Sequence, residues 1–93
     1  MQLRDINLAK DVIDNDTPQY SLDGKIEPMF YNEGNYPVKI FGFTVTPGSQ
    51  FNAGFINSRT HGTVDIHFQA AEEPNIIKKI ICVYGTYREQ KNC

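Results

Sequence analysis

The chain has 93 residues and a net charge of −2, with 40% hydrophobic and 12% aromatic residues. This length supports one domain, and the apolar content is too high for a disordered chain. The lack of a basic excess argues against nucleic-acid binding, and no apolar run approaches the ~20 residues of a membrane span. Residues 1–16 are too charged for a signal peptide, so we expect a chain that is made and used in the cytoplasm.

Residues 1–18 are predicted to form an extended or partly helical N-terminal arm. Aspartates interrupt its loose helical spacing, and the residue before Pro18 is disfavoured in a helix. Residues 1–35 hold seven acids and three bases, a balance of −4, whereas residues 36–93 hold four acids and six bases, a balance of +2. The arm is therefore either a solvated acidic segment or one that docks on the basic face of another copy. Its apolar residues are the predicted interaction residues: Leu3, Ile6, Leu8, Val12 and Ile13.

Residues 19–93 are predicted to form one β-domain, because Ile, Val, Phe and Tyr dominate its apolar positions. The dipeptide Asp23-Gly24 predicts a turn between two short strands. Pro28 lies inside the second of these strands, which predicts that this strand is at a sheet edge or contains a bulge.

The next segment, residues 36–55, predicts a hairpin followed by a tight turn. A two-residue turn at Phe41-Gly42 places four apolar side chains on one buried face, whereas a single strand with a bulge near Gly42 is the alternative. The four are Val38, Ile40, Phe43 and Val45. Pro47 and Gly48 then fit the central positions of a type II turn over residues 46–49.

Two further strands complete the predicted domain. Residues 63–69 alternate strictly, which places Val64, Ile66 and Phe68 inward and Thr63, Asp65, His67 and Gln69 outward. Residues 76–87 are predicted to form a long strand, apolar on both faces from residue 80 to residue 83, as in a central position. Six to eight short strands in ~90 residues predict an all-β fold, a small antiparallel β-sandwich or jelly-roll-like barrel.

Few side chains offer chemistry. A metal site could be formed by His61, His67 and Asp65. A structural zinc site needs four ligands and a catalytic one three, so exposed residues on a solvated strand face are the better interpretation. Cys82 with His67 could form a thiolate pair, yet the apolar neighbours of Cys82 favour a buried protonated thiol. Nucleotide-binding, zinc and nucleophile motifs are missing from the sequence. We therefore expect no enzyme, no catalytic residue, no metal and no cofactor, with Cys82 and Cys93 as free thiols.

Tyrosines are the remaining binding candidates. Such rings stack on sugars or bases, but they also serve as core residues and interface anchors. We single out four of them as surface aromatics: Tyr20, Tyr31, Tyr36 and Tyr87. The fifth, Tyr84, shares this ambiguity.

The stretch from "NEGNYPVKIFGFTVTPGSQFNAGF" through "GTVDIHFQ" resembles small β-rich structural proteins of bacteriophage virions. The resemblance rests on Gly42, Pro47, Gly48 and Phe51, in a turn that β-geometry selects in many sandwiches. It implies a minor capsid, decoration, spike-base or tail component that is assembled in the host cytoplasm. The expected partners are other copies of the chain and other structural proteins. The alternative is a monomeric ligand-binding β-sandwich for carbohydrate or for a peptide added at a sheet edge.

Overall fold

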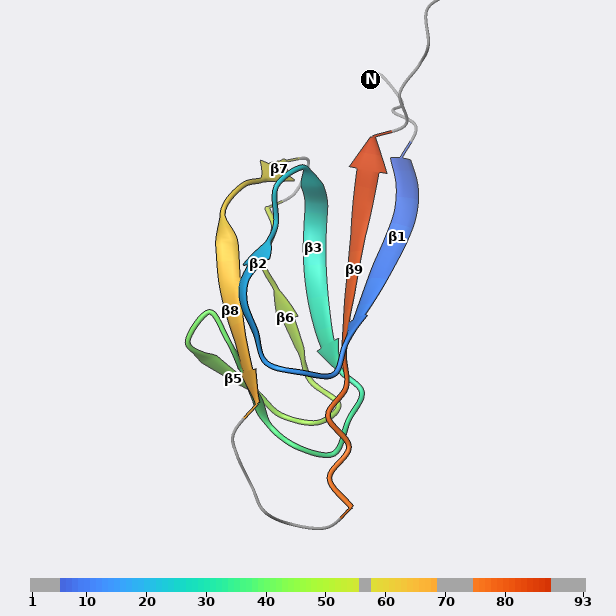
Figure 1. The fold of residues 1–93 in the computed structure, drawn as a ribbon. Coiled ribbons are helices and arrows are strands. Elements are labelled where there is room, and N and C mark those ends of the chain that lie inside the picture. Colours follow the sequence, from blue (N-terminus) through green and yellow to red (C-terminus); the bar gives the residue numbers. More distant parts are fainter. Residues whose placement is uncertain (1–5, 56–57, 69–74, 88–93) are drawn as a thin grey trace, which may run out of the picture.

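A computed structural model describes residues 6–55, 58–68 and 75–87 (Figure 1). These residues form strands and no helix, so none of them belongs to a helix that could cross a bilayer. The strands are β1 (Ile6–Ile13), β2 (Thr17–Ser21), β3 (Lys25–Asn32), β4 (Val38–Ile40), β5 (Phe43–Val45), β6 (Gln50–Asn52), β7 (Arg59–Thr60), β8 (Thr63–Phe68) and β9 (Ile80–Tyr87).

The strands form two antiparallel sheets. The first sheet has the order β1-β9-β3-β6, with β7 also paired to β3, and the second has the order β2-β8-β4-β5. The chain crosses between the sheets at most connections (Figure 1), and β4 and β5 form a local hairpin. Without the two-residue β7, the other eight strands have the order of a jelly roll. The predicted all-β fold, a small antiparallel β-sandwich or jelly-roll-like barrel, is confirmed, and the two packed sheets make it a sandwich.

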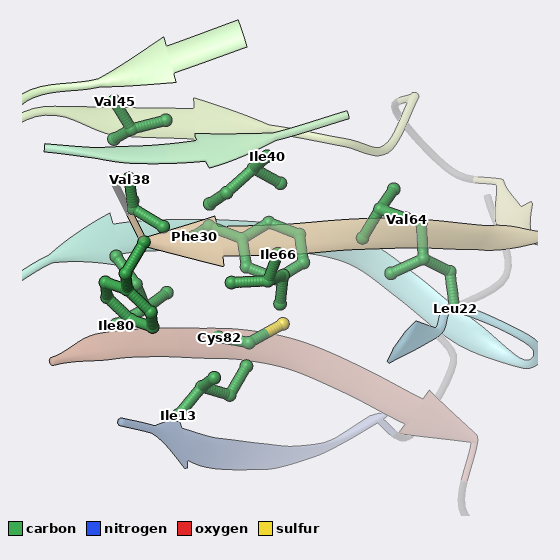
Figure 2. Packing of buried hydrophobic residues seen from close by; sticks show 11 residues of the cluster. Ile13, Leu22, Phe30, Val38, Ile40, Val45, Val64, Ile66, Ile80 and Cys82 are labelled. Carbon is green, nitrogen blue, oxygen red and sulfur yellow. The ribbon is translucent and has the colours of Figure 1, made fainter. Parts of the chain in front are cut away.

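The core lies between the sheets (Figure 2). Val64, Ile66 and Phe68 of β8 are buried while Thr63, Asp65 and His67 are exposed, as the alternation predicted; Gln69 lies outside the described residues. Phe30 of β3 and Cys82 of β9 are fully buried on the facing sheet. Because successive strand residues point to opposite faces, these positions also define the outer face of each sheet.

The predicted N-terminal arm needs correction over residues 6–13. These residues form β1, which pairs with β9 in register from Ile6 opposite Tyr87 to Ile13 opposite Ile80. The pairing satisfies the backbone groups of β1 that face β9 and makes β1 the edge strand of the first sheet. Ile13, predicted to be an interaction residue, is buried in the core instead. Leu3 lies outside the described residues.

The predicted hairpin is confirmed, but one of its four side chains is not buried. Val38 pairs with Val45 and Ile40 with Phe43, around a turn in which Phe41 and Gly42 have φ of 51° and 81°. Phe43 nevertheless keeps 59% of its surface exposed, because it lies at the edge of the sandwich, where its ring stacks on Phe51 at 5.6 Å.

The predicted turn over residues 46–49 is also present. The Ser49 amide donates to the Thr46 carbonyl at 3.0 Å, and Gly48 has φ of 81°, as its third position requires. The Asp23-Gly24 turn is closed by the Lys25 amide, which donates to the Leu22 carbonyl at 3.0 Å. It joins β2 and β3, which belong to different sheets.

Strand β3 is bulged rather than at an edge. It lies between β9 and β6, and its register to β9 shifts between Ile26 and Met29. Glu27 has φ of 48° at this shift, and Pro28 is buried beside it. The bulge removes the need for a ladder hydrogen bond from Pro28 and so allows proline inside a central strand.

Strand β9 is central as predicted, but it begins at Ile80 rather than at residue 76. The residues just before β9 form hydrogen bonds with the loop after β3 and do not pair with a strand. The Asn35 side chain accepts from the Ile77 amide at 2.7 Å and donates to the Asn75 carbonyl at 2.9 Å. Gly34 packs so closely here that a Cβ would lie 2.1 Å from the Ile77 oxygen.

Asn32 joins the two sheets at the end of β3. Its side-chain amide donates to the Val45 carbonyl at 3.0 Å and the Tyr36 carbonyl at 2.8 Å, and its oxygen accepts from the Gly34 amide at 3.0 Å. Asn32 is 1% exposed, so these hydrogen bonds take the place of the bonds that its side chain would make to water.

Candidate functional site: the outer face of the first sheet

The outer face of the first sheet has an apolar part on β1, β9 and β3, with β9 in the middle, and a polar margin on β6, where Gln50 and Asn52 are exposed (Figure 1). Ile80 and Cys82 point into the core, so Ile81 and Val83 point outward. The register places outward residues of β1 and β3 on either side of β9 in cross-strand rows. Val12, Ile81 and Tyr31 form one row, Lys10, Val83 and Met29 the next, and Leu8, Gly85 and Ile26 the third.

We call these nine residues the outer apolar face, since eight of them are apolar or aromatic or are glycine. Leu8 is 81% exposed, Val12 is 55% exposed and Tyr31 is 36% exposed, whereas Ile26 is buried. Ile6, 50% exposed, extends the face beyond Leu8. A sheet face in contact with water is normally polar, so the face is unusual among solvated sheet surfaces.

A hollow of about 260 Å³ lies within this face, above the bulge of β3. Gly85 forms part of its lining, and a Cβ there would lie 2.6 Å from Cγ2 of Ile6. Leu8 and Glu27 also contribute to the lining. The face therefore has a shape that receives an apolar side chain, and two opposite charges, Lys10 and Glu27, flank β9.

The outer face of the second sheet is polar and hydrogen-bonded. The Asp16 carboxylate accepts from the Phe68 amide at 2.8 Å and lies 2.9 Å from Nδ1 of His67. Asp65 accepts from the Gln19 amide at 2.8 Å. The Phe68 amide, followed by His67, holds the pKa of Asp16 below its usual value. Asp65 and His67, which the sequence offered as metal ligands, thus bind the chain that runs into and along β2.

A polar cluster lies inside the sandwich beside the core. The Tyr20 hydroxyl donates to the Asp11 carboxylate at 2.5 Å, and Lys25 Nζ lies 5.1 Å from the centre of the Tyr20 ring. Burial raises the pKa of the Tyr20 phenol, with Asp11 adding to the effect. Burial likewise raises the pKa of the Cys82 thiol. Both groups stay protonated at neutral pH, and a protonated thiol is a poor nucleophile.

The predicted tyrosines do not share one surface. Tyr31 lies on the outer apolar face, and Tyr87 is opposite Ile6 at the end of β9. Tyr20 packs edge-on against Phe30 at 5.8 Å, and Tyr36 is half-buried in the loop after β3. Tyr84 packs against the core beneath Lys25 Nζ, 4.7 Å from its ring centre, and burial raises its pKa. Stacking on one extended ligand would require rings on a common face.

Within residues 6–55, 58–68 and 75–87, no three histidine, cysteine, aspartate or glutamate side chains gather as a metal site would need. His61 lies 3.8 Å from Asp23, and both side chains are exposed. The predicted turn residues serve local geometry: Gly42 lies in the β4–β5 hairpin, and Pro47 and Gly48 lie in the turn between β5 and β6, which belong to different sheets.

Sequence reasoning found three of the nine residues of the outer apolar face, Leu8, Val12 and Tyr31, and missed the other six. Ile6, Leu8, Val12 and Tyr31 were singled out, whereas Met29, Ile81, Val83 and the two flanking charges were not. The signal was the apolar run of β9 on both strand faces, which was interpreted as burial on both sides. One side packs in the core, and the other forms the outer apolar face.

Compared with protein families, with curated proteins and with solved structures, the chain has no match.

Proposed function

We propose that the chain is a non-enzymatic structural component of a larger protein assembly and attaches through the outer apolar face. The observation that carries this proposal is the row of Val12, Ile81 and Tyr31 continuing to Leu8, across three paired strands. Monomeric proteins rarely expose continuous apolar patches of more than a few hundred Å², and larger ones mark protein contacts. A neighbouring chain would remove this surface from water.

The chemistry of the described residues supports a binding role over a catalytic one. The buried thiol of Cys82 is kept protonated, and Asp16 is engaged by a backbone amide and an imidazole. The hollow in the outer apolar face is open and offers a single carboxylate, Glu27, among apolar groups. Active sites combine a nucleophile or metal with a positioned base, which this hollow lacks.

The assembly that we propose is a bacteriophage virion, with the chain as a minor capsid, decoration, spike-base or tail protein. The resemblance at Gly42, Pro47, Gly48 and Phe51 supports this, and jelly rolls occur in viral capsid domains. They also occur in lectins, so the fold alone does not decide between these functions. In this proposal the partners are copies of the chain and other virion proteins, met in the host cytoplasm.

A second candidate, a module that binds an extended peptide, is favoured by the free edge of β1. Among the described strands β1 pairs with β9 alone, and it runs for 8 residues. The other edges are less suited to pairing, since β2 contains Pro18 and an irregular register, and β5 and β6 have 3 residues each. A peptide added to β1 would extend the first sheet.

A pair of substitutions on the two outer faces tests the proposed function. Tagged full-length chain is expressed in its native cells as wild type, as Val83→Glu and as Thr44→Glu, and the native mass of each complex is measured. Thr44 is the control because it is also β-branched and lies opposite Lys39, on the outer face of the second sheet. We expect the wild type and Thr44→Glu in a complex larger than a dimer, and Val83→Glu as free chain.

A wild-type chain that is free in its native cells would contradict the assembly role. A Val83→Glu variant that stays in the complex would show that the chain attaches through a surface other than the outer apolar face. A variant that instead loses binding of a short peptide, with an unchanged native mass, would favour the peptide module.

A further inference from the structure

We propose that the outer apolar face binds a second copy of the chain, face to face, about a two-fold axis that runs along β9. This inference rests on the proposed function, because it names the first partner of that surface. Edge-to-edge pairing of two β1 strands would leave the face in water, whereas face-to-face packing covers it.

The register of the first sheet makes the face complementary to itself. Strands β1 and β3 flank β9, so a rotation about an axis along β9 places β1 of one copy over β3 of the other (Figure 1). Val12 and Tyr31 both lie beside Ile81, and Leu8 and Ile26 both lie beside Gly85. Val12 of each copy therefore meets Tyr31 of the other.

The same rotation matches a protruding side chain to the hollow. Leu8 is 81% exposed, whereas Ile26 is buried beneath the hollow that Gly85 leaves open. Leu8 of each copy is thereby brought over Ile26 and Gly85 of the other. An apolar side chain inserted in a pocket is the usual anchor of a protein interface.

The charges obey the same symmetry. Lys10 lies opposite Val83 on the β1 side, and Glu27 lies on the β3 side, next to Ile26, at the bulge before the Met29 position. The rotation brings Lys10 of each copy to Glu27 of the other, so that two ion pairs form at the margins of an apolar centre. Any register that paired Lys10 with Lys10 would be repelled.

The size of the face sets the strength of the contact. Strands β1, β3 and β9 have 8 residues each. At ~3.3 Å per residue and ~4.8 Å between strands, two such faces bury roughly 800 Å² before side-chain relief is counted. That area is below the ~1,200 Å² at which stable specific interfaces begin and is in the range of weak, transient contacts, so the dimer is weak and depends on concentration.

Sedimentation velocity of the purified full-length chain, from about 1 μM to about 1 mM, tests the inference. We expect a monomer–dimer equilibrium in the wild type. Lys10→Glu and Glu27→Lys should each raise the dissociation constant by roughly ten-fold or more, because like charges then face each other. The double variant should return it to within about three-fold of the wild type, as opposite charges meet again.

Lys39→Glu is the matched control, since Lys39 lies on the outer face of β4, in the second sheet, and is exposed. This variant should dimerise as the wild type does. Leu8→Asp should abolish the dimer while circular dichroism stays unchanged, because the side chain is exposed in the single chain.

A purified wild type that stays monomeric at all these concentrations would overturn the inference. The proposed assembly role would then still be tested by the Val83→Glu experiment. If the double variant of Lys10→Glu and Glu27→Lys fails to restore the dimer, a two-fold axis along β9 would be wrong. A native complex no larger than this dimer would contradict the proposed function and leave the dimer standing.

Discussion

The two sheets have similar inner faces and very different outer faces. Inward side chains of both are buried aliphatic and aromatic groups, from Phe30 on one sheet to Ile66 on the other (Figure 2). Outward, the second sheet presents Asp65 and His67, which are engaged by the chain around β2. The first sheet presents Val83 and Leu8, which belong to a continuous apolar surface.

This difference separates stability from recognition. The polar outer face contributes to holding one chain together, because its carboxylates accept amide hydrogen bonds from distant segments. The apolar outer face contributes less within the chain, since Leu8 and Val12 keep most of their surface exposed. The apolar outer face contributes free energy when another surface covers it, at roughly 25 cal/mol for each Å² of apolar area removed from water.

The largest effect on stability is expected at the joint between the sheets. Asn32→Leu would remove the side-chain donor that the carbonyls of Tyr36 and Val45 now have, while the Gly34 amide would keep its bond to the Lys79 carbonyl. We expect a loss of about 2–3 kcal/mol in the free energy of unfolding, because buried unsatisfied groups keep their desolvation cost. Urea unfolding measures it.

Asn52→Leu is the control for that experiment, because Asn52 is an exposed asparagine in β6. It should change stability by less than about 0.5 kcal/mol. Equal effects of the two variants would show that Asn32 does not couple the sheets.

A smaller effect is expected on the polar outer face. Asp16→Asn should cost about 1 kcal/mol at neutral pH, since the carboxylate makes charge-assisted bonds but is mostly in solvent. Thermal unfolding at several pH values measures the difference between variant and wild type.

The sign of the pH dependence follows from the lowered pKa of Asp16. The stabilisation is complete above the unfolded-state pKa, near 3.8, and is lost as the pH falls through the lower folded-state pKa. The gap between wild type and Asp16→Asn should therefore close below pH 3.8. A gap that stays constant down to pH 2 would contradict a role for the ionised carboxylate.

The smallest effect on stability is expected on the apolar outer face. Val83→Thr should cost less than about 1 kcal/mol, because the side chain is half-buried. Val64→Thr, the same change in the core, should cost about 1–2 kcal/mol more, since it buries a hydroxyl without a partner. Urea unfolding of the two variants compares the faces directly, and equal losses would mean that Val83 is a core residue.

Local features of the fold were predictable from the sequence. The strict alternation in β8 and the turns at Gly42 and Gly48 depend on neighbouring residues, and the structure confirms them. The place of β1 depends on pairing with β9 at the opposite end of the chain, which no local pattern encodes. For that reason residues 6–13 were interpreted as an arm.

The candidate site was predictable in part for the same reason. Apolar residues on both faces of β9 indicate burial on both sides, but the pattern does not say whether this chain or another covers them. Phe43 shows the converse, since its hairpin partner was predicted correctly while its exposure depends on where the facing sheet ends.

Hydroxyl-radical footprinting tests the central claim, that a protein covers the outer apolar face. Met29 and Tyr31 on that face are compared with His67 on the other, in the assembled form isolated from native cells and in dilute purified chain. We predict that assembly slows oxidation of Met29 and Tyr31 several-fold and leaves His67 unchanged, because a covering chain excludes water. Equal oxidation of Met29 and Tyr31 in both forms would contradict the account.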